Sequence, residues 1–427
     1  MRERWLNHID WMLIVLYVIL TVLGWISIYS ACYRGGSVGI SWNSNEGRQL
    51  IWLAASLPVL TCVLWLDGRT YQALAYVFYA LSVLMLGSTL LWGIGKAGHR
   101  AWLAWGGQPG ELAKCTCALA IAKCLDAPRK PSAQLHSHAA LIFLIALPMG
   151  VVLLQGDAGS ALVFFAFVLV LYREGLSVGW LCVAAGLVMV FVLGLLVAHT
   201  YLIVGMISVG LLVAGVYRKS WKKLILIGCV TFTALLWLRG THTLVHRVLK
   251  PHQQNRIKAL VDPNIDPLGI GWNVTQSKIA IGSGGLWGKG FLQGTQSRYG
   301  FVPERSTDFI FCTIGEEHGW IGSTLLVTCF VVFLLRMLHV AERQRTRFAR
   351  AYGYSVASLF FFHFAINIGM TIGLVPVIGI PLPLVSYGGS SLWSFSAMVF
   401  ILVRLDAERH TYHHRHLRAQ TLLDQTP

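Results

Sequence analysis

The chain has 427 residues, of which 56% are hydrophobic and only 12% are charged, and its mean hydropathy is +0.63. Soluble domains carry about 25% charged residues, so a chain of this composition cannot cover itself with polar groups. Its apolar runs are long enough to cross a hydrocarbon core of roughly 30 Å. They lack the alternation of a membrane β-barrel. We therefore predict an all-α fold, a polytopic transmembrane helix bundle that forms a single membrane domain over residues 1–427, and we expect no nucleic-acid partner.

Apolar runs that can span a membrane follow one another along the chain. The first is too long for a cleavable signal peptide and is counted as a span. The signal is weakest for residues 110–125 and 159–172. The runs 178–198 and 201–217 are separated by two residues only, so they form either a hairpin or one broken helix. The twelve candidates are residues 11–31, 49–66, 73–93, 110–125, 138–154, 159–172, 178–198, 201–217, 223–239, 318–336, 352–373 and 384–403.

The distribution of Lys and Arg sets the orientation of these spans. With the N-terminus inside, the short outer loops hold only Arg34, Arg48, Lys96 and Arg100, whereas most other cations lie on inner connections and tails. The positive-inside rule favours this arrangement, which leaves both termini in the cytoplasm. Residues 405–427 then form a cytoplasmic basic tail. Its histidines can bind metal, but a disordered tail beside anionic lipid is the favoured interpretation.

One outward connection, residues 240–317, is much longer than the others. It is rich in Gly and half apolar, which predicts re-entrant or membrane-apposed helices rather than a free linker. Nine Lys and Arg, from Arg239 to Arg305, lie in it or directly before it. Such an excess suits an anionic lipid substrate.

Two carboxylates at the outer ends of spans are candidates for function. Glu111 lies one helical turn before Lys114, so the two can pair. That pair is either a structural ion pair or a contact to substrate. Asp157 lies in a turn between spans, where capping through the backbone N–H of Gly159 or Ser160 is the alternative to a functional role.

The long segment holds three further candidate stretches. Two Asp-Pro steps place Asp262 and Asp266 four residues apart. Asp266 is close in sequence to Arg256 and can accept a proton from a sugar hydroxyl. The five glycines of Ile281-Gly-Ser-Gly-Gly-Leu-Trp-Gly-Lys-Gly290, with Lys289 and Arg298, suit either a backbone cradle for pyrophosphate or a flexible hinge.

The third stretch gathers Glu304, Asp308, Glu316 and Glu317 ahead of the next span, where Thr307 or Asp308 can also serve as the helix cap. Elsewhere, Cys115 and Cys117 have the spacing of a metal pair. They lack further ligands nearby, so simple packing is the favoured interpretation.

A series of motifs in this order resembles the SEDS family (shape, elongation, division, sporulation) of bacterial cell-wall glycosyltransferases, and within it the elongation branch more than the division branch. The resemblance runs through most of the chain. It rests on Gln108-Pro-Gly-Glu-Leu-Ala-Lys114, Gln155-Gly-Asp-Ala-Gly-Ser-Ala-Leu162, Asp266-Pro-Leu-Gly, Gln276-Ser-Lys-Ile-Ala-Ile-Gly-Ser-Gly-Gly285, Pro303-Glu-Arg-Ser-Thr-Asp-Phe-Ile-Phe311, Asn367-Ile-Gly-Met and Gly379-Ile-Pro-Leu-Pro-Leu-Val-Ser-Tyr-Gly-Gly-Ser-Ser391.

The resemblance implies a multi-pass protein of the bacterial inner membrane with Asp266 as its essential loop aspartate. Two departures affect the neighbouring positions. The usual Gln-Pro-Asp-Leu-Gly-Thr is Gln-Gly-Asp-Ala-Gly-Ser here, and Ser306 replaces the usual His. Most members have ten spans, two fewer than our candidates. The substrate-binding candidates are Glu111, Lys114, Asp157, Arg100, Arg256, Lys278, Lys289, Arg298, Glu304 and Asp308.

By resemblance, the expected reaction is polymerisation of lipid II into glycan strands during cell elongation. Asp266 is the expected general base, and a divalent cation, Mg or Mn, can assist the leaving pyrophosphate. The expected partners are lipid II, undecaprenyl-linked glycan, membrane lipid, a class B penicillin-binding protein and other membrane proteins of the elongation machinery. A lipid II flippase is the rival function, because many spans with buried carboxylates also describe a carrier. A non-catalytic scaffold is the third.

Overall fold

The computed structural model describes residues 8–33, 39–40, 42–96, 99–103, 106–127, 134–175, 190, 199–216, 220–243 and 270–423. The chain divides into two compact units. One comprises residues 1–174, 276–372 and 378–427, and the other comprises residues 175–275 and 373–377.

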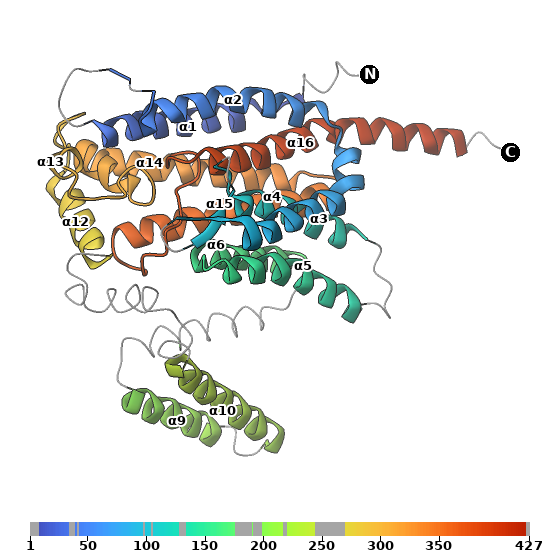
Figure 1. The fold of residues 1–427 in the computed structure, drawn as a ribbon. Coiled ribbons are helices and arrows are strands. Elements are labelled where there is room, and N and C mark those ends of the chain that lie inside the picture. The colour runs from blue at the N-terminus through green and yellow to red at the C-terminus, as the bar shows by residue number, and fades with distance from the viewer. Residues whose placement is uncertain are drawn as a thin grey trace. The chain divides into compact units, whose positions relative to one another are not determined.

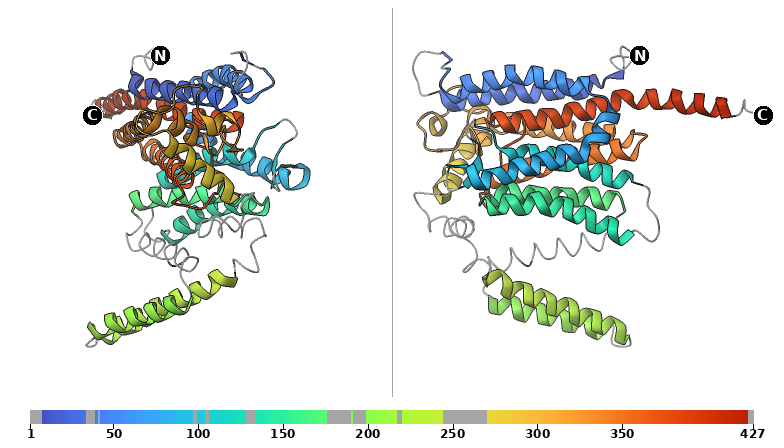
Figure 2. Two further views of the ribbon diagram at one scale, coloured as in Figure 1. Left: turned by 90° about the vertical axis from the view of Figure 1, so that its left-hand side faces the viewer. Right: turned by 45° about the vertical axis from the view of Figure 1, so that its right-hand side comes forward.

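The first unit is a bundle of long helices that lie side by side (Figures 1 and 2). Its smaller elements include the short helices α6 (Ala158–Val163) and α7 (Phe167–Arg173), which are joined by the 3-10 turn η4 (Phe164–Ala166). They also include the helix α13 (Thr295–Arg298) and an antiparallel hairpin of β1 (Ile94–Lys96) and β2 (His99–Trp102). The long helices are α1 (Trp11–Cys32), α2 (Asn45–Trp65), α3 (Gly68–Trp92), α4 (Pro109–Asp126), α5 (Gln134–Leu154), α14 (Ile310–Glu342), α15 (Arg347–Thr371) and α16 (Gly389–Leu423).

The second unit contains a helix pair, α9 (His199–Val216) and α10 (Trp221–Thr243). The two pack closely at Gly210, where an added Cβ would lie 2.8 Å from Thr231 Oγ1. The run predicted at 201–217 therefore pairs with the run that follows it. The run at 178–198 lies outside the described residues except for residue 190. One further helix, α12 (Ile270–Ser283), precedes α13 in the long segment, where helices were predicted.

The predicted helical membrane bundle is confirmed. Six described helices are long and apolar enough to cross a membrane, namely α1, α2, α3, α14, α15 and the part of α16 up to Arg409. Shorter apolar helices cover 139–154, 158–173, 200–216 and 223–236. A chain with these helices is a multi-pass membrane protein.

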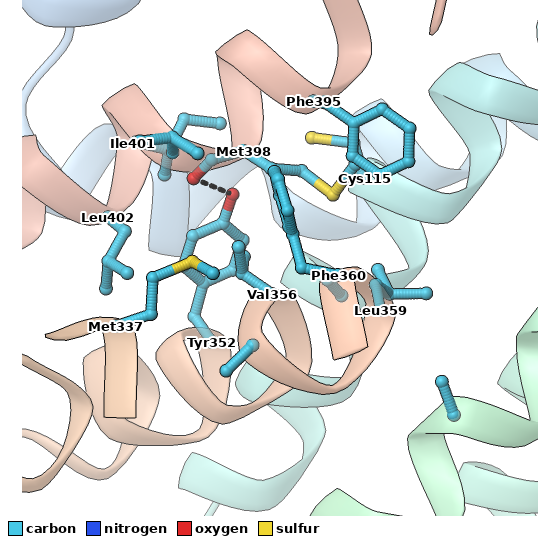
Figure 3. Close-up of a cluster of buried hydrophobic side chains, with 14 of the residues drawn as sticks. Cys115, Met337, Tyr352, Val356, Leu359, Phe360, Phe395, Met398, Ile401 and Leu402 are labelled. Carbon is cyan, nitrogen blue, oxygen red and sulfur yellow. Dashed lines mark hydrogen bonds between the residues drawn. The ribbon is translucent and has the colours of Figure 1, made fainter. Parts of the chain in front are cut away.

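Helix α4, which gave a weak signal in the sequence, is the centre of the first unit. Fourteen of its 18 residues are buried, against α3, α5, α15 and α16. Cys115 and Cys117 are buried and unbridged, as the packing interpretation predicted. Cys115 belongs to a buried cluster in which the Tyr352 hydroxyl donates to the Met398 carbonyl at 3.2 Å and so joins α15 to α16 (Figure 3).

An ion-pair network fastens the end of the bundle at which α1 begins. Asp10 accepts hydrogen bonds from Arg336 at 2.7 Å and Arg343 at 2.5 Å, and Arg343 also pairs with Asp406 of α16. Burial alone raises the pKa of the Asp10 carboxyl, but the Arg336 and Leu13 N–H donors and the nearby cations hold it below its ordinary value. The start of α1 and residue 406 therefore lie at the same end.

The structure places the first residues of the predicted tail, 405–427, inside the bundle. Leu405, Asp406 and Ala407 are buried within the bundle, because Asp406 is a member of the ion-pair network. Helix α16 then continues to Leu423.

At the opposite end of the bundle, α14 breaks at Gly319, which has φ 62° and ψ −157°. In an unbroken helix the N–H groups of Trp320 and Ile321 would bond to carbonyls four residues back. Here they donate instead to the carbonyls of Gly285, at 2.8 Å, and Leu286, at 3.2 Å. Residues 284–290, which we call the glycine segment, thus supply the acceptors that the helix lacks.

The exchange is reciprocal. The carbonyls of Glu316 and Glu317, freed by the break, accept the N–H groups of Lys289 at 3.0 Å and Gly290 at 2.9 Å. Backbone groups in an apolar environment must be satisfied within the protein. Four backbone hydrogen bonds therefore join the glycine segment to the broken helix.

Glycine is required for this close approach. A Cβ on Gly288 would lie 2.0 Å from the Glu317 carbonyl oxygen, and one on Gly319 would lie 2.4 Å from the Gly288 nitrogen. Because four backbone bonds hold the glycine segment, the flexible-hinge interpretation is wrong. The N–H groups of residues 288, 289 and 290 donate to carbonyls of the chain. They are therefore not free to bind a pyrophosphate in the predicted backbone cradle.

The predicted cap of this helix is corrected as well, and the helix begins before the predicted span 318–336. Helix α14 begins at Ile310, and its N-cap residue is Phe309, with no side-chain cap. Thr307 lies two residues before the N-cap, and its hydroxyl donates to Glu304 Oε2 at 2.9 Å. Asp308 directly precedes the N-cap residue.

Substitution Gly288→Ala tests this joint. The added Cβ would meet backbone rather than a movable side chain, so we expect a loss of about 1–3 kcal/mol of stability from overpacking, with further strain from the positive φ of 82°. The measurement is the unfolding temperature in detergent. Gly282→Ala in α12 is the matched control, since its Cβ meets nothing within 4 Å. Equal unfolding temperatures for the two variants would contradict the proposed joint.

Candidate functional site

The loop between α15 and α16, residues 378–388, brings the motifs of the chain together, and we call it the hub loop. Helix α15 holds it from one side. Asn367 donates to the Ile380 carbonyl at 2.7 Å and to the Asp308 carbonyl at 2.9 Å. One turn earlier, His363 Nδ1 lies 3.1 Å from the Pro381 carbonyl oxygen. The hub loop and the segment before α14 are thus fixed to one face of α15.

The segment 303–308 is fastened to the hub loop directly. The Tyr387 N–H donates to the Ser306 carbonyl at 2.9 Å, and the Ser386 hydroxyl donates to the Thr307 carbonyl at 2.6 Å. Asn45 of α2 donates to Ser306 Oγ at 3.1 Å. Two motifs that lie about 80 residues apart in the sequence therefore share one surface.

The turn around Asp157 meets the same hub loop. A Cβ on Gly159 would lie 2.5 Å from the Ile378 carbonyl oxygen, so the start of α6 packs directly on this backbone. Asp157 caps α6 by accepting the Ser160 N–H at 2.9 Å, which confirms the capping interpretation. Its other oxygen accepts a hydrogen bond from Gln108 at 3.2 Å. Gln108 begins the motif of α4, so the cap also links two motifs.

A buried charged cluster on α4 and α15 lies against the hub loop. Lys114 is 0% exposed and Glu111 is 2% exposed. Lys114 Nζ donates to Glu111 Oε1 at 2.7 Å and lies 3.1 Å from His363 Nε2. Because an ammonium group only donates, Nε2 must be the acceptor, and Nδ1–H donates to Pro381. His363 is therefore a neutral imidazole of defined tautomer.

This cluster keeps unused hydrogen-bonding capacity. Glu111 Oε2 is buried and has no partner in the described part of the chain. Lys114 has three donors, and the contacts to Glu111 and His363 use two of them. A group that both donates and accepts, such as a hydroxyl or a water molecule, fits beside such a pair. The arrangement permits either open interpretation, a structural ion pair or a substrate contact.

Lys289 is engaged elsewhere. Its ammonium donates to Glu316 Oε1 at 2.8 Å and to Thr295 Oγ1 at 2.7 Å. Glu316 also accepts the N–H groups of Gln296 at 2.8 Å and Ser297 at 2.9 Å, so it caps α13. The charge of Lys289 is balanced by a carboxylate, which leaves it poorly suited to hold a pyrophosphate.

The other predicted residues are dispersed. Arg298 is exposed and lies over the Tyr33 ring at 5.7 Å, and Lys278 is exposed on α12. Glu304 is exposed and bonds within its own turn, so it does not cluster with Glu316. Arg100 belongs to β2. Arg256, Asp262 and Asp266 lie outside the described residues.

A divalent cation finds no ready site in the part of the chain that the structure describes. No group of three or more His, Cys, Asp or Glu side chains comes together there in a way that could hold a metal ion. No step of a reaction is therefore assigned to a metal.

Three residues that organise the site were given no role from the sequence: His363 was not noted, whereas Asn367 and Glu316 were noted only within a motif and an acidic group. His363 and Asn367 are polar residues in an otherwise apolar span, which is a signal of function or pairing in a membrane protein. The candidates at membrane depth were restricted to carboxylates and their cationic partners, so neither residue was included. Glu316 was noted only as a member of an acidic group, because nothing in its local sequence reveals its contact with residues 289–297.

Comparison with known proteins agrees with this arrangement. The peptidoglycan glycosyltransferase RodA of Treponema pallidum is 31% identical over 443 residues, covering 96% of this chain and 100% of the relative. MrdB of Escherichia coli, also named a peptidoglycan glycosyltransferase, is 31% identical over 94% of both chains. A solved chain from work on structural coordination of polymerization and crosslinking by a peptidoglycan synthase complex is 27% identical. It matches with a TM-score of 0.67, over 94% of this chain and 98% of that chain.

The profile of the cell cycle protein family FtsW/RodA/SpoVE matches residues 10–204 and 197–411. This confirms the predicted resemblance to the SEDS proteins, because the match covers nearly the whole chain and not a single motif. The chain therefore belongs to the FtsW/RodA/SpoVE family.

Proposed function

We propose that this protein is a peptidoglycan glycosyltransferase that polymerises lipid II into glycan strands during cell elongation. The observation that carries the proposal is the similarity, at 31% identity along almost the whole chain, to two relatives named peptidoglycan glycosyltransferases. The convergence of the family's motifs on the hub loop supports it. A carrier function needs no such gathering of motifs at one end of the bundle.

In the proposed reaction Asp266 is the general base. It accepts the proton of the C4 hydroxyl on the acceptor sugar as that oxygen attacks C1 of the donor sugar. The new C4–O–C1 bond forms while the bond from C1 to the pyrophosphate oxygen breaks. Undecaprenyl pyrophosphate leaves with the bonding electrons. Cations near the leaving group stabilise its negative charge.

We propose that Arg256, Lys278 and Arg298 bind the pyrophosphate of the leaving group. Lys278 and Arg298 are exposed on elements that flank the glycine segment, so their charges are accessible to an anion. Lys289 is given a structural role instead, because Glu316 pairs with it. A divalent cation, Mg or Mn, could assist by neutralising charge on the pyrophosphate.

A crosslinking partner is part of the proposal. One solved relative comes from a synthase complex that coordinates polymerization and crosslinking. We propose that this chain likewise works with a class B penicillin-binding protein in the bacterial inner membrane, with both termini in the cytoplasm. Arg100 and the exposed Glu304 remain predicted substrate contacts.

Substitution Asp266→Asn tests the general base. An amide cannot accept the proton, so the rate of glycan formation from labelled lipid II should fall by about 10²–10⁴-fold. The assay uses purified protein in detergent, with and without a cognate transpeptidase, and reads polymer on a gel. Asp262→Asn is the matched control because the same Asp-Pro step occurs four residues earlier. It should retain activity close to that of the unmodified protein.

The same assay separates the rival functions. Polymer made in detergent, without any membrane asymmetry, supports the enzyme, whereas a flippase would give none. An Asp266→Asn variant with full activity would remove the general base from the proposal. A scaffold predicts no polymer from the purified protein under any condition.

The Glu111–Lys114 pair permits a second test through a double substitution. Replacing either partner alone leaves a buried uncompensated group, at a cost of about 3–5 kcal/mol. Replacing both, as in Glu111→Gln with Lys114→Met, removes the imbalance and should recover most of the unfolding temperature in detergent. If the pair contacts substrate, polymerisation should stay low in that double variant.

Recovery of both stability and activity in the double variant would show that the pair is structural only. A His363→Gln variant serves as the control. Its side-chain oxygen can replace the imidazole acceptor for Lys114, so stability and activity should both stay close to those of the unmodified protein.

A further inference from the structure

An exposed apolar patch lies beside the break in α14. Its members are held next to one another because Trp320 and Ile321 donate backbone hydrogen bonds to the glycine segment. Trp287 is 80% exposed, and Trp320 and Leu286 are each 64% exposed. Isolated exposed apolar side chains need no explanation, but a contiguous group marks an interaction surface. We call this group the aromatic patch; it comprises Leu286, Trp287, Phe291, Trp320 and Ile321.

The surface of α14 changes character at the break. Residues 310–317 are buried in protein, whereas the stretch from Trp320 to Leu335 contains no Asp, Glu, Lys or Arg and exposes Ile321 and Leu325. From Trp320 to Arg343 the helix rises about 35 Å. That is close to the roughly 30 Å thickness of a hydrocarbon core. Trp320 thus lies at one boundary of the lipid-facing surface.

Other exposed tryptophans of the first unit mark the ends of spans. Trp11 is the first residue of α1, Trp65 the last of α2 and Trp92 the last of α3. Tryptophan is enriched at membrane–water interfaces, where its ring meets the headgroups. Trp287 and the exposed Trp42 lie in loops instead. Leu286, the residue before Trp287, nevertheless accepts a hydrogen bond from the Ile321 N–H. This bond holds Leu286 close to Trp320, the residue before Ile321.

We propose that the aromatic patch inserts into the headgroup region of the bilayer and anchors the glycine segment there. Lipid is the occupant because Ile321 belongs both to the patch and to the exposed apolar face of α14 that continues to Leu325, and its N–H bonds to the Leu286 carbonyl. The bundle therefore has a membrane contact formed by a loop rather than a span. The anchor holds the segment that follows α12 at headgroup depth, whatever reaction the protein performs.

The test measures depth with a nitroxide label. Leu286→Cys is prepared with the exposed Cys62 and Cys229 replaced by Ser, and with Cys182 replaced as well, so that Trp287 stays intact. The protein is placed in nanodiscs of phosphatidylcholine and phosphatidylglycerol. Accessibility to molecular oxygen, which concentrates in lipid, is compared with accessibility to a water-soluble nickel chelate. Labels at Leu325→Cys and Gln293→Cys provide the lipid and loop references.

We expect the label at position 286 to lose most of its nickel accessibility relative to position 293 and to respond to oxygen as position 325 does. Nickel accessibility equal to that at position 293 would overturn the proposal, because the patch would then lie in water. Shielding from both reagents would also overturn it, because a second copy of the chain would then cover the patch. A repeat with Trp287→Cys guards against misfolding of one variant. No reaction is measured, so the outcome is independent of the proposed activity.

Discussion

The break in α14 at Gly319 is the constraint on which this end of the bundle depends. It lets one helix serve two environments: its first eight residues are inside protein, and its remainder has one face packed on the bundle and one face exposed. The break would leave backbone groups unpaired in an apolar setting, which is costly. The glycine segment removes that cost by exchanging four hydrogen bonds with the helix. Because its first half is buried, α14 can carry Glu316 and Glu317 into the interior, where Lys289 and Ser30 supply donors.

The same need for partners explains the charged cluster on α4. An ammonium at 0% exposure is tolerable only when hydrogen-bonded groups surround it. Glu111 balances the charge of Lys114, His363 adds an acceptor, and the Pro381 carbonyl fixes which imidazole nitrogen carries the proton. The hub loop is thus connected to the charge of Lys114 through the Pro381 carbonyl and the His363 ring. A change in the hub loop would alter the position of Lys114 without touching it.

Much of the fold could be predicted from the sequence because lipid-exposed helices are uniformly apolar. Helix α4 gave a weak signal for the opposite reason: its surroundings are protein, so it uses small and polar residues where other spans use large apolar ones. The capping role of Asp157 and the packing of Cys115 followed from local chemistry. The role of the glycine segment did not, because its glycines are set by a contact with residues 315–319, far along the chain. For Asp266 the sequence and the family remain the whole basis of its assignment.

At both departures from the family pattern a contact that does not depend on the altered side chain is kept. Gly156 has a φ of 87°, which a proline could not adopt because its ring fixes φ near −65°. The turn therefore takes another path, yet Asp157 still caps α6. Ser306 stands where relatives have His, and its carbonyl accepts the Tyr387 N–H that fastens the segment to the hub loop. Any residue offers that carbonyl. The departures consequently leave the convergence of motifs intact, and a proposal based on that convergence survives them.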